Sequence, residues 1–139
     1  MTTTRSVEND PLAQVSRHAH WLLRFALASV FLYMGIDKFM GGGIREFADI
    51  MALPYLIAVL VALAEIGAGA FIIAGAVLGT WITRLGALAA LPVLLGAIFM
   101  MHWGQWHFMA TPTHPLGGMM FQVTLVMLAL YLLLRGNEA

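Results

Sequence analysis

The chain has 139 residues, of which 61% are hydrophobic and 10% charged, and its formal net charge is zero. Soluble domains carry about 25% charged residues, so the composition predicts an integral membrane protein, and the lack of a basic patch argues against nucleic acid as a partner. The sequence contains no cysteine, which excludes disulfides, thiolate-held zinc and iron–sulfur ligation by this chain.

The polar N-terminus has no short apolar core, so we expect no cleavable signal peptide. Asp10 and Pro11 are typical of a helix cap and a first helical residue, and they predict one helix that continues to about Met40. Glycines at 41–43 end this helix.

Apolar stretches predict four membrane-spanning helices, at about 19–40, 55–79, 84–102 and 117–135. Their apolar runs are continuous rather than alternating, and they approach the roughly 20 residues that cross a bilayer core as a helix. The segment 44–52 has one apolar face and is predicted to lie as a short helix at the interface. The predicted fold class is all-α, an integral membrane four-helix bundle with residues 1–139 as a single domain.

Lysine and arginine predict the orientation of the bundle, with both termini on the cytoplasmic side. That side would hold Arg5, Arg17, Arg84 and Arg135, and the other side Lys38 and Arg45.

A series of short motifs resembles the DoxX family of small four-helix membrane proteins. The motifs are Arg24 with FLYMGIDK at 31–38, Leu53-Pro54, Ala64-Glu65-Ile66-Gly67, Gly75, Gly79, Thr83-Arg84, His102 and Gly117-Gly118. The resemblance implies a multi-pass protein of the bacterial inner membrane. Some family members associate with quinone-linked sulfur oxidation, or with terminal-oxidase and redox-defence complexes. Members commonly carry an acidic residue after the Gly-Gly step of helix four, where this chain has only Gln122 to form hydrogen bonds.

Glu65 and Arg24 are the first candidates for a catalytic or binding site. A carboxylate about ten residues inside a span must find a partner or be neutral. If both helices cross the same bilayer core, the backbones of Arg24 and Glu65 are separated by roughly 7–8 Å along the membrane normal. An arginine side chain can cover that distance. Such a pair would either form a proton or head-group site or only fix helix register, and the sequence leaves both open.

Asp37 and Lys38 close the first span at the outer interface. Solvation or snorkelling at a helix end is the expected role of both side chains, although Asp37 is also a candidate for holding a polar head group and Lys38 for contacting a ligand.

The segment after the third span is rich in histidine and tryptophan, with His102, Trp103, Trp106 and His107 as candidate ligand-binding residues. The imidazoles could donate to a quinone carbonyl, or the segment could form an interfacial aromatic belt. The spacing matches no standard metal motif, so no metal is expected. No firmly bound cofactor is expected, although a quinone or a lipid could bind.

Gly75, Gly79 and Gly86 are predicted to be helix-packing residues. If Glu65 points into the bundle, a ridge of Gly75 and Gly79 falls about 80–120° round the helix from it. That position predicts a contact with a partner subunit or a second copy.

The preferred functional hypothesis is a subunit, non-catalytic or redox-associated, of a larger respiratory or energy-converting membrane complex, with the bilayer and other membrane subunits as partners. One alternative is a quinone-reactive oxidoreductase subunit that uses a pocket of His102, Trp103, Asp37 and Glu65. Another is a small proton-coupled transporter in which Glu65 is the carrier.

Overall fold

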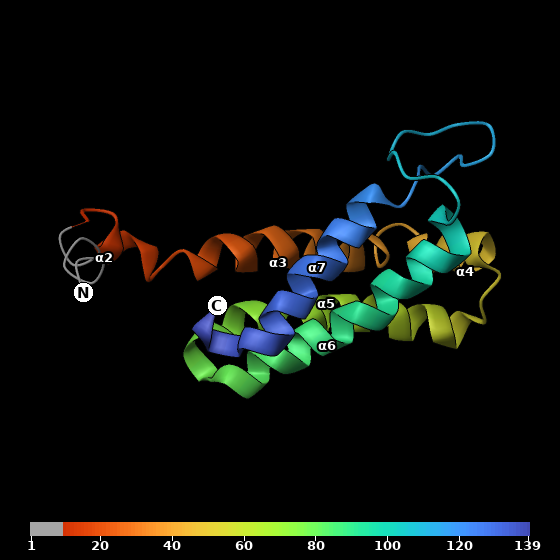
Figure 1. Cartoon of the computed structure of the whole chain (residues 1–139). Helices are drawn as coiled ribbons and strands as arrows, with labels where there is room; N and C mark the ends of the chain where they lie inside the picture. Colours follow the sequence, from red (N-terminus) through yellow and green to blue (C-terminus); the bar gives the residue numbers. More distant parts are fainter. Residues whose placement is uncertain (1–9) are drawn as a thin grey trace.

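The computed structural model describes residues 10–139, and all regular structure within that range is helical, so the predicted all-α class is confirmed. Its elements are α2 (Ala13–Ser16), α3 (His20–Asp37), α4 (Gly43–Met51), α5 (Tyr55–Leu78), α6 (Thr80–Ala97), the π-helix η1 (Ile98–His102), α7 (Met120–Arg135) and the 3₁₀ helix η2 (Gly136–Glu138). Figure 1 shows α4 and the loop 103–119 at one end of the bundle, here called the loop end. The C-terminus and the turn between α5 and α6 lie at the opposite, terminal end.

Four helices are long and apolar enough to cross a membrane, as predicted: Ala13–Asp37, Tyr55–Leu78, Thr80–His102 and Met120–Glu138. Large apolar side chains face outward along them. Leu22, Val77 and Leu134, for example, are 73%, 81% and 74% exposed. A bundle in water would hide such surfaces, whereas a bilayer solvates them, so these faces contact lipid.

The first predicted helix is shorter and less regular than expected. A turn over 17–19 separates α2 from α3, and α3 ends at Asp37 rather than Met40. Gly41 and Gly42 then reverse the chain with φ angles of 56° and 85°, values that a glycine adopts without strain.

The predicted short amphipathic helix is present as α4. Its Ile44 and Ala48 are buried against Ala58 and Ala62 of α5. α4 therefore covers the first turns of α5, which extend beyond the end of α3.

Small residues bring the central helices close together. α5 packs against both α3 and α6, and α6 packs against α7. Ala68, Ala87, Ala90 and Ala129 are fully buried at these contacts, so the helix backbones approach closely there.

The predicted partner-facing ridge is wrong at Gly75, which faces α6 of the same chain, and it stays a prediction at Gly79, whose Cβ position has nothing within 4 Å. A Cβ on Gly75 would overlap the side chain and backbone of Thr83, and one on Gly86 would lie 2.9 Å from the carbonyl oxygen of Ala68. Gly79 ends α5 with a φ of 131°. The prediction treated α5 in isolation, whereas α6 begins one residue after it and folds back over this face. Gly75 and Gly86 are thus packing residues inside the chain.

Candidate functional site

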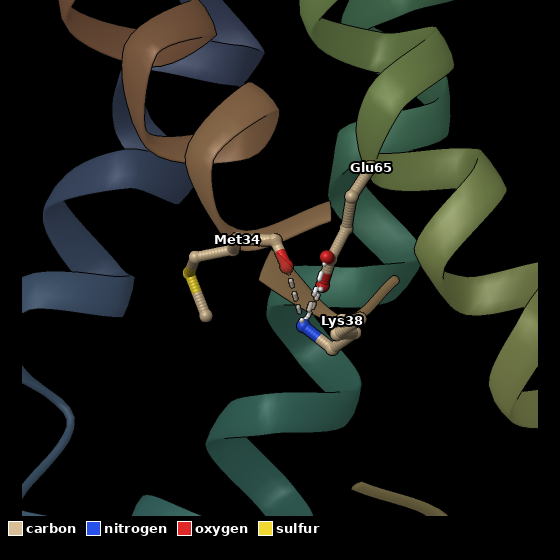
Figure 2. A network of polar contacts seen from close by, with 3 residues as sticks. All are labelled: Met34, Lys38 and Glu65. Carbon is tan, nitrogen blue, oxygen red and sulfur yellow. Dashed lines mark hydrogen bonds and ion pairs between the residues drawn. The ribbon is translucent and has the colours of Figure 1, made fainter. Parts of the chain in front are cut away.

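A buried ion pair joins the end of α3 to the middle of α5. The Nζ of Lys38 donates to Oε1 of Glu65 at 3.0 Å and to Oε2 at 2.9 Å, and it also approaches the Met34 carbonyl oxygen at 3.4 Å. Figure 2 shows the ammonium between these acceptors. The two side chains are only 10% and 4% exposed. The pair therefore keeps a lysine and a glutamate inside the bundle without leaving either charge unpaired.

The expected approach of Arg24 to Glu65 is wrong, and so is the expectation that Lys38 only snorkels to the interface. A Cβ on Gly35 would meet Ala62 and Ile66, so Glu65 is level with the end of α3. Arg24 lies 11 residues before Gly35, about 16 Å further along α3 at about 1.5 Å per residue. The prediction assumed that α3 and α5 cross the membrane at the same depth, whereas the first turns of α5 extend beyond the C-terminal end of α3.

Arg24 instead holds the terminal end together. Its guanidinium is fully buried and donates to four neutral acceptors, with no carboxylate among them. These acceptors are His20 Nδ1 at 2.9 Å, the Ile72 carbonyl oxygen at 2.6 Å, Thr83 Oγ1 at 2.9 Å and Asn137 Oδ1 at 2.8 Å. One side chain thus links α3, α5, α6 and η2, so its observed contacts are those of a structural residue.

A cavity of about 300 Å³ lies toward the loop end, lined by side chains of α3, α4, α5, α6, η1 and α7. Its walls are mostly apolar, with contributions from Phe31, Val61, Leu94, Met101, Leu116 and Leu125. The polar groups on its wall belong to Lys38, Glu65, His102 and Gln122. A cavity of this size with a few polar groups on an apolar wall is typical of a small-molecule site.

His102 reaches the cavity because of how the third span ends. α6 continues through Pro92 and widens into the π-helix η1, whose last residue is His102. π-Helical turns are frequent at functional sites. His102 is 9% exposed, with its ring Nδ1 at 2.8 Å from the Gly117 carbonyl oxygen and its Nε2 at 3.2 Å from Nε2 of Gln122.

The other loop candidates lie outside this cavity. Trp103 and Trp106 are 59% and 52% exposed, and His107 is exposed beside Gln105. Asp37 is exposed too and does not line the cavity. Of the four residues of the predicted quinone pocket, the structure brings together only Glu65 and His102.

The residues that complete the site were harder to find in the sequence. Lys38 was a candidate ligand contact but not the partner of Glu65, and Gln122 was noted only as a possible hydrogen-bonding residue. The available signal for Gln122 was a polar amide near the start of a largely apolar helix.

Metal binding remains untested. Within residues 10–139, no three His, Asp or Glu side chains gather in a way that would hold an ion. The expectation that no metal binds stays a prediction.

Comparisons with known proteins give one family. The model of the DoxX family matches residues 19–103, which is more than half of the chain. Comparisons with curated proteins and with solved structures found no match. The matched range contains Arg24, Lys38, Glu65 and His102, and it ends before α7 and Gln122.

Proposed function

Since the chain belongs to the DoxX family, we propose that it is a redox-associated subunit of a larger membrane assembly and that its cavity binds the head group of a lipophilic quinone. The membrane in question is the bacterial inner membrane. The observation that carries the proposal is the cavity itself, which combines apolar walls with the polar groups of Lys38, Glu65, His102 and Gln122.

The cavity suits a ring that carries oxygen atoms and an apolar tail. Phe31, Leu94 and Leu125 offer apolar surface for the ring and tail, whereas Gln122, whose amide is bonded to His102, has a second N–H for a ligand oxygen. Lipophilic redox carriers reach such a site from within the bilayer, and side chains along four apolar helices face that bilayer. A soluble substrate would gain little from these walls.

The geometry gives less support to a proton-coupled transporter that uses Glu65 as its carrier. Both oxygens of this carboxylate accept hydrogen bonds from Lys38, so protonation would leave a buried ammonium without its counter-charge. The pair is better suited to a fixed polar wall than to a group that loads and releases protons.

The quinone proposal is tested by filling the cavity. Gly96 lines the cavity and has open space around its Cβ position, so Gly96→Phe places a ring in the cavity without a backbone clash. Gly67 has equally open surroundings and does not line the cavity, which makes Gly67→Phe the matched control. Binding of a decyl-substituted benzoquinone is measured in lipid nanodiscs by quenching of tryptophan fluorescence, with empty nanodiscs as the partition baseline.

We expect saturable binding by the wild type and by Gly67→Phe, and a loss of at least about tenfold in affinity for Gly96→Phe, which corresponds to roughly 1.4 kcal/mol. Equal affinity in all three proteins places the quinone elsewhere and overturns the cavity assignment. For the subunit role, purification in a mild detergent should recover a redox-active membrane enzyme together with this chain. Purification as an isolated protein contradicts that role.

A further inference from the structure

The seam between α5 and α6 is tight near the terminal end and open toward the loop end. A Cβ on Gly75 would overlap Thr83 of α6, and one on Gly86 would lie 2.9 Å from the Ala68 carbonyl oxygen. Farther along α6, no neighbouring group in residues 10–139 lies within 4 Å of the Cβ position of Gly96, although this residue is half-buried and lines the cavity. The two helices have therefore separated at this level, and Figure 1 shows them diverging toward the loop end.

The sequence of α6 accounts for this divergence. Pro92 lies inside the helix, beyond the close contact at Gly86. Proline has no N–H to donate and its ring meets the carbonyl one turn earlier, so it bends a helix. From Ile98 the chain continues as the π-helix η1, whose turns are wider than those of an α-helix. Both features change the course of the third span after it leaves the tight part of the seam.

Apolar side chains border the gap that results. Val61 lies on the α6 side of α5, because it is two turns before Ala68, whose carbonyl oxygen contacts α6. Ile50 of α4 and Met100 of η1 are exposed, and both line the cavity together with Val61. Residues that line a cavity and also reach the outer surface lie at its mouth. The cavity thus has an apolar mouth between α5 and α6, beside Gly96, that opens toward the hydrocarbon of the bilayer.

The cavity also reaches the surface between α3 and α7, but there its wall carries large side chains. Met34 of α3 and Phe121 of α7 line it, and each is 46% exposed. Gly96 contributes no side chain to the opposite wall. The α5–α6 side therefore leaves more room for a chain to pass.

The size of the cavity requires that a long ligand extend beyond it. A volume of about 300 Å³ is at the lower limit for sites that enclose small molecules, so it suits a ring but not a ring together with a long apolar tail. The polar groups of Lys38, Glu65 and Gln122 favour the head group inside the cavity. The tail leaves where the wall is apolar and open.

We propose that the tail of the ligand passes between α5 and α6 beside Gly96 and continues into the bilayer, with Val61 and Met100 against its first carbons. The mouth beside Gly96 is then the route by which the ligand enters and leaves the cavity. This inference rests on the proposed function and adds the position of the tail and the residues that accommodate it.

The test compares two ligands and three proteins. The ligands are a decyl-substituted benzoquinone and the same ring with a methyl group in place of the decyl chain. The proteins are the wild type, Val61→Phe and Met34→Phe, all in lipid nanodiscs. Val61→Phe narrows the mouth between α5 and α6, and Met34→Phe places the same ring on the α3–α7 side as the matched control. The measured quantity is the ratio of the dissociation constants of the decyl and methyl ligands, and comparing this ratio between proteins cancels the partition of each ligand into the bilayer.

We expect Val61→Phe to raise this ratio about tenfold and Met34→Phe to change it by less than about twofold, because only the first variant obstructs the tail. A ratio raised by Met34→Phe alone places the tail between α3 and α7 and overturns the inference, as does a ratio unchanged in both variants, while the quinone site stands. A wild type that binds neither ligand overturns the proposed function together with the inference.

Cross-linking of the wild type decides the matter if Val61→Phe fails to fold. The decyl benzoquinone then carries a diazirine on a tail carbon close to the ring, and the labelled peptides are identified by mass spectrometry. Labels within 57–65 and 92–100 that an excess of the unmodified ligand removes support the α5–α6 route. Labels within 30–38 and 119–125 contradict it.

Discussion

Lys38, at the C-terminal end of α3, holds both carboxylate oxygens of Glu65 on α5, at 3.0 and 2.9 Å, on the wall of the cavity. Neither charge is paired with any other ionised side chain in residues 10–139. Because hydrocarbon surrounds the bundle, each charge depends on the other to remain buried. The pair therefore fixes the offset between α3 and α5 and at the same time gives the cavity its charged wall.

Breaking this pair on one side should cost more than removing it. Lys38→Met leaves a buried carboxylate and Glu65→Leu leaves a buried ammonium, and each is expected to lower the free energy of unfolding by about 3–5 kcal/mol. The double variant carries no buried charge and should lie within about 1–2 kcal/mol of the wild type, since well-packed apolar residues replace such pairs at little cost. Unfolding in mixed micelles with increasing SDS, followed by circular dichroism, measures all three.

The corresponding cycle with Arg24 and Glu65 is the control. These two residues lie about 16 Å apart along the bundle axis, so the effects of Arg24→Met and Glu65→Leu should add within about 0.5 kcal/mol. Additivity in the Lys38 and Glu65 cycle, or strong coupling in the Arg24 cycle, contradicts the pairing described here.

The membrane-spanning helices could be predicted because hydropathy is a local property. Each span of about 20 apolar residues can be recognised from its own residues, without reference to the rest of the chain. The partner of Glu65 could not be predicted in the same way. It depends on the offset between α3 and α5, which places Gly35 against Ala62 and Ile66, and such an offset is a tertiary property that no local sequence pattern gives.

The candidate site was predicted only in part for a related reason. His102 and Glu65 stood out as polar residues in apolar surroundings, and both line the cavity. Trp103 follows His102 and Asp37 precedes Lys38 in the sequence, yet neither residue lines the cavity. Side chains next to each other on a helix or in a loop point in different directions, so sequence proximity does not place them in one cavity.

Gly75 should tolerate no side chain, whereas Gly67 should. A Cβ on Gly75 would lie within 2.8 Å of the Cα of Thr83, and the Cβ position of Gly67 has nothing within 4 Å. Gly75→Ala is therefore expected to destabilise the bundle by about 1–3 kcal/mol. Gly67→Ala should change stability by less than about 1 kcal/mol, in the stabilising direction, because alanine favours the helix. The same SDS unfolding series measures both, and equal effects would mean that α5 and α6 are not in close contact at Gly75.

Asn137 is expected to contribute to stability although it lies close to the C-terminus. Its Oδ1 accepts from Arg24 at 2.8 Å and from Thr83 at 2.7 Å, and its Nδ2 donates to the Gly75 carbonyl oxygen at 2.8 Å. Asn137→Ala leaves part of the buried guanidinium unsatisfied and should cost about 1–3 kcal/mol. Glu138→Ala alters the neighbouring exposed residue and is the control, with an effect expected within about 0.5 kcal/mol. If both variants unfold at the same SDS fraction, η2 does not hold Arg24 in place.

The ion pair also bears on the orientation of the protein in the membrane. Arg84 and Arg135 belong to the terminal end, whereas the loop end has Lys38 and Arg45. Lys38 is buried and paired with Glu65, whereas Arg45 is exposed. Of these two cations at the loop end, only Arg45 therefore counts toward the preference of lysine and arginine for the cytoplasmic side. The bias toward a cytoplasmic terminal end is thus stronger than a count along the sequence suggests.

Cysteine labelling tests this orientation against a clean background, because the sequence has no cysteine of its own. Thr113 is exposed in the loop and Glu138 is exposed at the terminal end. Glu138 is preferred to its neighbour Asn137, whose side chain is bonded to Arg24. In intact cells, Thr113→Cys should react with a membrane-impermeant maleimide, and Glu138→Cys should react only after permeabilisation. The reverse pattern would place both ends of the bundle on the opposite sides and put the cavity near the cytoplasmic face. Labelling of both positions in intact cells would mean that the four helices do not all cross the bilayer.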